Sequence, residues 1–345
     1  DWSSTLPEEE RSYFYPSATA SFVFSELVDL KVLSFGKIRA GWSQVGNDTD
    51  PYNTENVYVN SQPFNNSGSS TVGNELLNAN LRPEKISSFE IGTDLRFFVD
   101  RVRVDLTYYN SVTEDLLFGV AQSSATGYSR RFTNAGKVKN TGIEITLGGT
   151  PVKRKDFRWD VDVNYAKNNN EVLELIDGVD ALTLTSLFGV TLEARVGESY
   201  GTFMGTGYQT DASGNRLVDA SGFYMATDER VALGTYLPDF TGGIGNTFTF
   251  KNLSLYALID FQKGGSLHSY SNQWGKYSGT LEETAEGGIR ENGIVVEGVY
   301  APGVIIDDVD VSGQENTTNI DAQSHFFSNQ GYVINEADQY DASFV

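Results

Sequence analysis

The sequence contains no cysteine, which excludes disulfide bridges, thiolate metal sites and cysteine nucleophiles. It also lacks any run approaching 18 consecutive apolar residues, so a membrane-spanning helix is excluded. The formal charge of −21 would repel phosphate backbones, which argues against nucleic acid as a partner. Proline is scarce, with 8 residues in 345, whereas 35 glycines, 18 tyrosines and 21 phenylalanines are present. This composition is typical of strands and turns rather than helices.

Two segments near residue 100 alternate between apolar and ionised side chains. Their apolar positions are Phe89, Ile91, Leu95 and Phe97 in the first segment and Val102, Val104, Leu106 and Tyr108 in the second. Because successive side chains point to opposite sides of a strand, each predicted strand has one apolar face and one ionised face. A wall between hydrocarbon and an aqueous lumen requires this pattern.

About eight such strands are predicted, at 13–24, 35–45, 84–97, 101–115, 136–149, 157–169, 240–250 and 253–263. Residues 340–345 have the pattern of a strand that is just beginning. At about 3.3 Å per residue and a tilt near 40°, a strand of about 11 residues covers roughly 28 Å, the height of an outer-membrane apolar band. Strands of globular proteins are shorter, at about 5–6 residues.

The connections alternate strictly between short and long. Those at 98–100, 150–156 and 251–252 are short, whereas those at 46–83, 116–135 and 264–340 are long. All the long loops therefore lie at one end of the sheet, as in outer-membrane barrels, and a β-sandwich has no reason to sort its loops in this way. The sequence predicts an all-β fold, a partial transmembrane antiparallel up-and-down β-barrel.

Several segments of the sequence resemble one family of membrane proteins. They lie at 13–26, 33–47, 81–92 (beginning Leu-Arg-Pro-Glu), 134–144 (beginning Asn-Ala-Gly-Lys) and 236–242. Together they are similar to the SusC-like, RagA-type TonB-dependent outer-membrane transporters of Bacteroidetes-type bacteria. The resemblance covers nearly the whole chain and is weakest at 170–235 and 280–335.

The resemblance implies a barrel of about 22 strands that holds an N-terminal plug. It also implies import of oligosaccharides or peptides across the bacterial outer membrane, energy from the TonB complex acting through the plug, and a SusD-like surface lipoprotein as partner. Residues 1–345 are then expected to be one part of the C-terminal half of the barrel, with about eight strands. The plug, the TonB box and the closing strands are expected to be absent from it.

The polar strand faces supply the first group of candidate site residues. We expect eight of them to face the lumen: Glu90, Asp94, Arg96, Arg103, Asp105, Glu144, Asp160 and Asp162. Pairs such as Asp160 and Asp162 also suggest the two carboxylates of a glycosidase. Their spacing of two on a polar face is more typical of lumen lining, and Arg96 and Arg103 are placed to pair with acids across strands.

Aromatic residues in the long polar loops are the second group, because aromatic faces stack on sugar rings and peptide side chains. These ligand-binding candidates are Tyr52, Tyr58, Phe64, Tyr128, Trp274 and Tyr277. Packing within the loops or contact with the lipoprotein lid is the alternative interpretation. The acids Asp307, Asp308 and Asp310 are a candidate calcium site, although no EF-hand spacing is present and a solvated acidic loop is the alternative.

No catalytic residue, resident metal or cofactor is expected. His268 and His325 are too few for a zinc site and are expected to be solvated loop histidines. A Gly-x-Ser-x-Gly elbow and a Gly-Lys-Ser/Thr phosphate loop are both missing. Two other functions remain open: a secreted all-β glycan-binding module or polysaccharide-active enzyme, and an adhesin barrel that does not transport.

Overall fold

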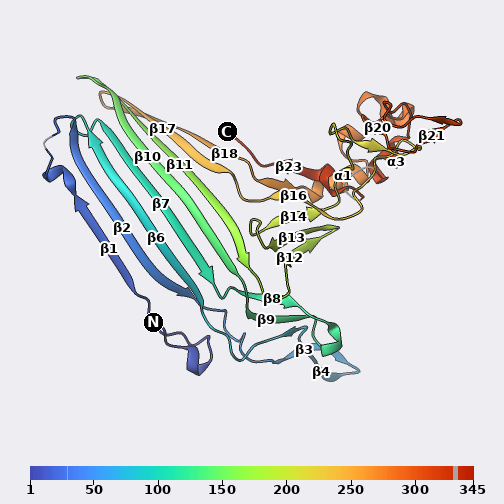
Figure 1. Cartoon of the computed structure of the whole chain (residues 1–345), viewed down its shortest axis with the longest axis horizontal. Coiled ribbons are helices and arrows are strands. Elements are labelled where there is room, and N and C mark those ends of the chain that lie inside the picture. Colours follow the sequence, from blue (N-terminus) through green and yellow to red (C-terminus); the bar gives the residue numbers. More distant parts are fainter. Residues whose placement is uncertain (29, 329–332) are drawn as a thin grey trace.

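An eight-stranded antiparallel sheet dominates the computed structural model, which describes residues 1–28, 30–328 and 333–345 (Figure 1). In spatial order its strands are β1 (Ser17–Val23), β2 (Leu33–Asn47), β6 (Glu84–Phe97), β7 (Val102–Glu114), β10 (Lys137–Lys153), β11 (Phe157–Glu174), β17 (Phe240–Phe250) and β18 (Leu253–Lys263). Each strand pairs with its neighbours in chain order, as in an up-and-down meander. The eight predicted strands and the all-β fold are confirmed.

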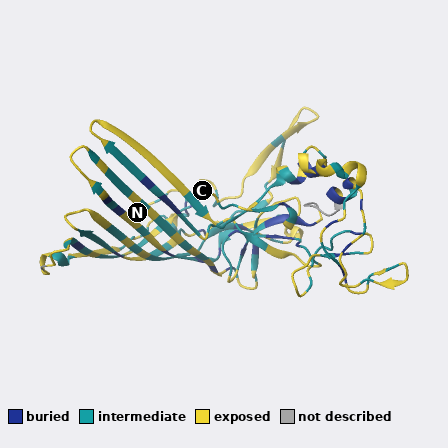
Figure 2. Cartoon of the chain, turned by 90° about the horizontal axis from the view of Figure 1, so that it is seen from above, coloured by how far each residue is buried: buried dark blue, intermediate teal, exposed yellow. Residues whose placement is uncertain are grey.

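The register places apolar residues of different strands in continuous rows. One row runs from Val104 through Leu147, Val163 and Ile244 to Ile259. Many apolar side chains of this face are exposed, and Figure 2 shows exposed residues recurring along the strands. A contiguous apolar surface of this extent on a sheet marks contact with another phase or partner. A secreted sandwich would bury this face against a second sheet.

The largest differences from the predicted strand bounds are in β1, β10 and β11. β1 is shorter than 13–24, whereas β10 and β11 extend beyond 149 and 169. Pro151, which the sequence places in a turn, lies inside β10 at a register shift between Gly149 and Val152. A bulge tolerates proline because the extra residue leaves the ladder there and its missing N–H costs no hydrogen bond.

Short connections lie at one end of the sheet and long ones at the other, as predicted (Figure 1). Phe98, Val99 and Asp100 form the tight β6–β7 turn with positive φ angles of 54°, 56° and 61°. The other short turns are 154–156 and 251–252, and the β1–β2 connection holds one helical turn, η2 (Phe24–Glu26). The opposite end, with the long loops, is called the outward end below.

The long loops contain more structure than the sequence predicts. Their strands are β3 (Tyr58–Phe64), β4 (Ser67–Val72), β5 (Glu75–Leu76), β8 (Leu117–Ala121), β9 (Arg130–Asn134), β12 (Ala181–Leu187), β13 (Val190–Arg195), β14 (Thr202–Gly205), β15 (Leu217–Val218), β16 (Val231–Thr235), β19 (Ser266–His268), β20 (Val299–Tyr300), β21 (Ile305–Ile306), β22 (Val309–Asp310) and β23 (Gln339–Asp341). Each of these strands spans seven residues or fewer, which is too short for a clear alternating pattern.

Helices occur mainly in the last loop. They are α1 (Tyr270–Tyr277), α2 (Ile289–Asn292) and α3 (Ala322–Ser328), with the 3₁₀ turns η1 (Glu8–Glu10), η3 (Ser124–Thr126), η4 (Glu282–Thr284), η5 (Glu286–Gly288) and η6 (Asn335–Asp338). Within the described part of the chain, every helix is too short or too polar to cross a bilayer.

Two buried apolar clusters lie at the outward ends of β10 and β11 and in the loops beyond the sheet. One contains Val138, Val172, Leu175, Leu182 and Ala194, and a second contains Val218, Val296, Tyr300 and Ile320. The predicted final strand at 340–345 is only partly formed: β23 pairs with β19, and Phe344 makes one bridge with Gln262 of β18. The loops therefore contain apolar cores, and the first of these is shared with Val138 of β10 and Val172 of β11.

Candidate functional site

The eight predicted polar residues of the strands all lie on one face of the main sheet. The pairing places Asp94 opposite Asp105, and Arg96 opposite Arg103. Glu144 pairs with Thr107 of β7, and Asp162 lies opposite Gly148. Glu90 and Asp160 belong to the same alternating set of positions. The sheet therefore has one polar face, opposite the apolar rows.

Long side chains on this face reach two strands away by crossing glycines. Arg39 of β2 passes over Gly92 of β6, and its Nη1 and Nη2 donate to the Asp105 carboxylate at 2.8 and 2.7 Å. Arg103 of β7 passes over Gly148 of β10 in the same way and donates to Asp162 at 2.9 Å. Each glycine leaves the space that a side chain on the middle strand would fill.

A tyrosine uses the third glycine crossing. The Tyr109 hydroxyl passes over Gly142 of β10 and donates to Asn168 Oδ1 at 3.0 Å. Lys37 and Arg96 both lie within 4.0 Å of Asp94, and Arg158 contacts Asp160. The polar face is thus a network of opposite charges. The predicted pairing across strands is confirmed for Arg103 with Asp162, whereas Arg96 contacts Asp94 of its own strand. Lys37 and Arg39 complete the network. They flank Ile38 in β2, so the alternating pattern places them on the face opposite Ile38.

Residues from two of the segments that resemble the family, 81–92 and 134–144, connect the strands at the outward end of the sheet, which we call the outward rim. Asn134 accepts a hydrogen bond from the Arg82 N–H at 2.8 Å and donates to the Arg82 carbonyl at 2.7 Å. Glu84 accepts from the Leu117 N–H at 2.8 Å, and Leu81 is fully buried. These residues fix the ends of β6, β8 and β9 to one another.

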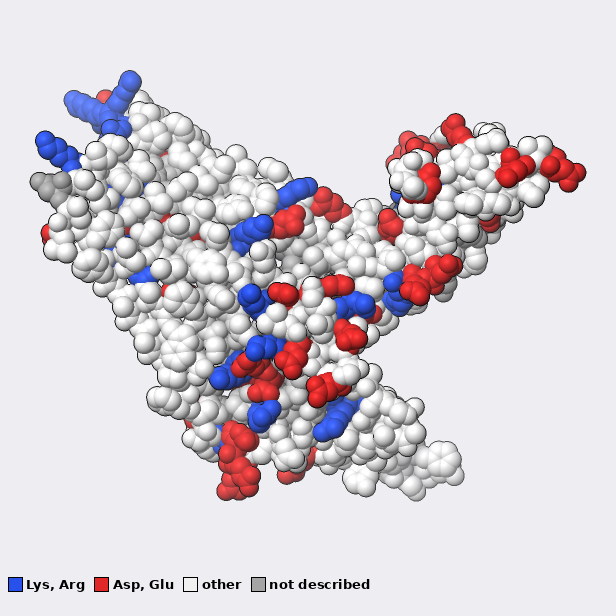
Figure 3. Space-filling model, viewed as in Figure 1, with Lys and Arg blue, Asp and Glu red and all other residues white. Residues whose placement is uncertain are grey.

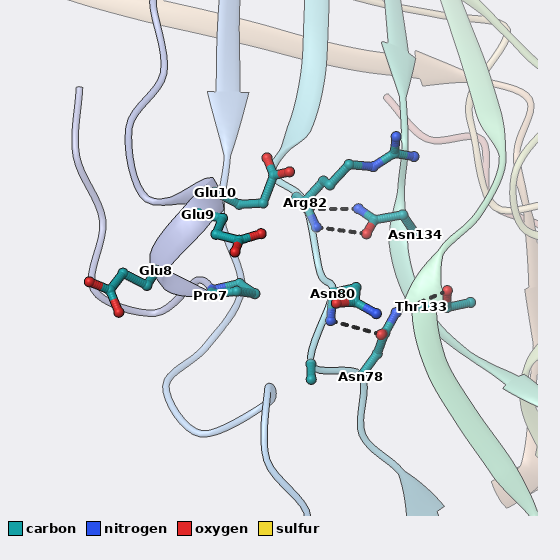
Figure 4. A pocket seen from close by; sticks show the side chains of 10 residues that line it. Pro7, Glu8, Glu9, Glu10, Asn78, Asn80, Arg82, Thr133 and Asn134 are labelled. Carbon is teal, nitrogen blue, oxygen red and sulfur yellow. Dashed lines mark hydrogen bonds between the residues drawn. The ribbon is translucent and has the colours of Figure 1, made fainter.

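An open polar cavity of about 600 Å³ lies beside this rim (Figure 4). Glu8, Glu9 and Glu10 line one side, and Asn78, Asn80, Arg82 and Asn134 line the other. Arg82 also contacts Asp115 at 2.7 Å, so its charge is already compensated. The cavity offers mainly carboxylate and amide oxygens to solvent, and its walls lack the aromatic faces expected of a stacking site.

A row of five aromatic rings crosses the far outward loops. The centroids are 4.4 Å apart for Phe188 and Tyr270, 5.9 Å for Tyr270 and Trp274, 5.3 Å for Trp274 and Tyr277, and 5.4 Å for Tyr277 and Phe327. We call these five residues the aromatic ridge. Four of them, all but Tyr270, are roughly half-exposed. The ridge joins the β12–β13 turn, α1 and α3, and it presents a continuous surface for stacking.

The structure brings only two of the six predicted ligand-binding aromatics into this ridge, Trp274 and Tyr277. Tyr58 and Phe64 lie on the separate β3–β4 hairpin, and Tyr52 precedes it. All three are strongly exposed, whereas Tyr128, just before β9, is half-buried. Sequence reasoning missed Phe188, Tyr270 and Phe327. Their only signal was an aromatic residue in a loop, because Phe188 and Phe327 reach the ridge from segments that are distant in the sequence from α1.

A buried ion pair holds the ridge in place from below. Lys276 Nζ of α1 lies 3.0 Å from Asp338 Oδ1, and the Asp338 side chain is 0% exposed. Burial is the largest single effect on Lys276 and opposes its charge, but the hydrogen bond to Asp338 and the Asp338 charge, together with Tyr340, outweigh burial and raise the pKa of the amine. Since removing one member of such a pair leaves a buried charge, this contact ties α1 firmly to the last segment of the chain.

The two histidines are not solvated, and that prediction was wrong. His325 is 5% exposed, and burial lowers its pKa to about 4, with the Lys276 cation adding to the effect. Burial also lowers the pKa of His268, partly opposed by the Asp338 carboxylate. His268 lies beside Gln273 of α1 and Gln339 of β23, and His325 belongs to α3, which packs against α1. Both histidines are therefore uncharged at pH 7 and pack within the fold.

The three candidate calcium ligands form a tight hairpin. Asp307 and Asp308 make the β21–β22 turn with φ angles of 48° and 61°, and the Asp310 carboxylate accepts hydrogen bonds from Ser312. Within residues 1–28, 30–328 and 333–345, no three His, Cys, Asp or Glu side chains are grouped closely enough to hold a metal ion. Calcium binding at this turn stays a prediction from the sequence.

Residues 1–285 match the family model described as "TonB dependent receptor-like, beta-barrel". Curated relatives include TonB-dependent receptor P26 of Formosa agariphila, 29% identical over 78% of this chain and 30% of its own length. TonB-dependent receptor SusC of Bacteroides thetaiotaomicron is 32% identical over 52% of this chain and 19% of its own length. The chain thus spans about a third or less of the length of these relatives.

Solved structures show the same fold. The RagAB peptide importer in its "closed-closed" state matches with a TM-score of 0.69 at 21% identity, over 80% of this chain and 32% of that chain. In the "open-open" state the match covers 99% of this chain and 36% of that chain, with the same TM-score and 19% identity. The main sheet and its outward loops therefore follow the arrangement found in those structures.

Proposed function

This chain belongs to the family of TonB-dependent receptor-like β-barrels, and on that premise we propose that it forms part of an importer for oligosaccharides or peptides. The family lies in the bacterial outer membrane. The single observation that carries the proposal is the two-faced sheet. It has an apolar face that no other layer of the described residues covers, and a polar face of paired charges. Placed in a bilayer, such a sheet separates lipid from an aqueous interior.

The polar face would line the passage for the nutrient. Its charges are held in pairs, for example Arg39 with Asp105 and Arg103 with Asp162. Paired charges present a hydrated wall that interacts weakly with a passing sugar or peptide. In this proposal, the wall guides the substrate, and selectivity lies in the loops above it.

The aromatic ridge is the proposed outward contact for the substrate. Half-exposed rings of Phe188, Trp274 and Tyr277 are held rigid by their mutual packing and by the Lys276–Asp338 pair. Pre-formed aromatic faces bind sugar rings or peptide side chains at a low entropic cost. Tyr52, Tyr58, Phe64 and Tyr128 are proposed as a second, looser set of contacts. A SusD-like lipoprotein is the proposed lid, and TonB, acting through a plug, is the proposed energy source.

Uptake measurements test this function in the native bacterium. Deleting the gene should abolish uptake of one class of fluorescent nutrient, oligosaccharide or peptide, and loss of TonB should do the same. The variant Phe188→Ala/Trp274→Ala/Phe327→Ala should restore uptake at least about tenfold less well than wild type, because stacking contacts are lost. Unchanged uptake of both nutrient classes after gene deletion would refute import.

A matched control separates the ridge from the importer as a whole. The variant Tyr52→Ala/Phe64→Ala removes two exposed outward aromatics that lie outside the ridge. It should retain most of the uptake at an equal surface level. If this variant lost more uptake than the ridge variant, import would stand, and the ridge would not be the main contact.

A further inference from the structure

Cations gather at the turn end of the main sheet, opposite the long loops (Figures 1 and 3). The β10–β11 turn contributes Lys153, Arg154 and Lys155, and the neighbouring turns add Arg101 and Lys251. We call these five residues the basic turn cluster. The same three turns contain two acids, Asp100 and Asp156. In a chain of net charge −21, this end is therefore locally cationic.

Within the described residues, none of the five cations lies within 4.0 Å of a carboxylate oxygen. All five are exposed. Among the described residues, Lys153, Arg154, Lys155 and Lys251 take part in no ion pair within 4.0 Å, whereas Arg39 and Arg103 on the polar face do. The Arg101 guanidinium donates to the carbonyls of Thr150 and Pro151 at 3.2 Å. The cluster thus leaves positive charge available to an external anion.

The cluster lies directly beyond the apolar face of the sheet. Towards the turns, the aliphatic row that contains Val163 gives way to Trp159 and Phe248, whose rings stack at 5.8 Å. The Trp159 indole N–H donates to Asn246 at 3.2 Å. An aromatic ring that is apolar on its face and polar at one edge favours the boundary between hydrocarbon and headgroups.

Exposed apolar side chains lie among the cations themselves. Val99 at the β6–β7 turn is 88% exposed, and Leu253 at the β17–β18 turn is 74% exposed. The Lys251 amine lies 5.4 Å from the centre of the Phe250 ring, which is also exposed. A surface that offers apolar groups and ammonium groups side by side matches the edge of a bilayer, where Lys and Arg stems cover acyl chains and their charges reach the phosphates.

We propose that the basic turn cluster binds anionic phospholipid headgroups in the inner leaflet of the outer membrane. This inference rests on the proposed function, because it requires the apolar face to lie in the bilayer. Lipid is the occupant since the cluster continues the lipid-facing surface and mixes cations with exposed apolar groups. An acidic protein or free phosphate would account for the charges but not for Val99 and Leu253. The lipid contact would anchor the short turns at a fixed depth.

Native mass spectrometry of the whole protein tests the proposal. Purified protein is equilibrated with equal amounts of phosphatidylglycerol and phosphatidylethanolamine, and the lipids that stay bound are counted. Wild type should retain phosphatidylglycerol preferentially. In Lys153→Gln/Arg154→Gln/Lys155→Gln that preference should fall about tenfold or more, because each cation near an anionic surface contributes to the attraction. A preference that is the same in the variant and in wild type would overturn the proposal.

Two controls keep the outcomes distinct. The charge-conserving variant Lys153→Arg/Arg154→Lys/Lys155→Arg should keep the preference, and the milder Lys155→Gln should show a partial loss if the triple variant fails to fold. Displacement of the lipid by millimolar inorganic phosphate would show a simple anion site and contradict the proposal. Heat-modifiable migration on gels reports the barrel separately. If the wild-type protein forms a barrel but does not prefer phosphatidylglycerol, only this inference is refuted. If it forms no barrel, the proposed function is refuted as well.

Discussion

Replacing Leu147 by lysine is expected to destabilise the barrel by about 2–4 kcal/mol, the cost of placing a cation on the lipid face near mid-bilayer. Leu147 lies near the middle of β10, on the apolar face, with Val104 and Val163 as its neighbours in the row. Lysine there would lose its hydration, and its neighbours in the row, Val104 and Val163, are apolar. The free energy of unfolding, measured by urea titration of the whole protein in lipid, checks this value.

The preceding residue supplies the matched control. Thr146→Lys makes the same kind of change in the same strand but on the polar face, directly opposite Asp105. The new ammonium group would remain hydrated and close to a carboxylate, so its effect should stay within about 1 kcal/mol. Equal destabilisation by the two lysines would contradict the assignment of the faces.

Adding one methyl group at Gly142 is expected to be among the most damaging small changes in the sheet. A Cβ at this position would lie 2.4 Å from the Tyr109 ring and hydroxyl and 2.5 Å from the Lys167 carbonyl oxygen. The tyrosine can rotate away only by giving up its hydrogen bond to Asn168, and the carbonyl belongs to the neighbouring strand. Gly142→Ala should therefore cost about 1–3 kcal/mol, the usual range for overpacking.

Gly149→Ala on the same strand is the control for this second prediction. There the nearest atoms to a new Cβ are 3.9 and 4.0 Å away, which is ordinary contact. Its effect on the urea midpoint should be small, or slightly stabilising because alanine has less conformational freedom to lose. If Gly142→Ala were tolerated equally well, the crossing of Tyr109 over the middle strand would be wrong.

The sequence predicted the main sheet well because long strands carry a strong alternating pattern. The bounds of β6, β17 and β18 were predicted correctly at both ends, where turn residues such as Lys251 and Asn252 interrupt the pattern. Pro151 misled the prediction, because proline usually ends a strand and here it occupies a bulge. The sorting of short and long connections then followed from the strand positions alone.

The details of the site could not be read from the sequence because they depend on register and on distant loops. Arg39 reaches Asp105 only because Gly92 lies between them, and that alignment needs the pairing of three strands. The aromatic ridge needs Phe188 and Phe327 to meet around α1. The burial of His325 depends on the folding of the same loop, which has no periodic pattern to reveal it.

The most direct test places single cysteines at neighbouring positions of β11. This chain has no cysteine of its own, so a thiol introduced at Val163 or Asn164 is unique within it. In intact outer membranes, a probe on Val163→Cys should be quenched by lipid-phase nitroxide, and Asn164→Cys should react with a water-soluble maleimide. Reversal of the two results, with lipid contact at 164 and aqueous reactivity at 163, would contradict the account of the two faces.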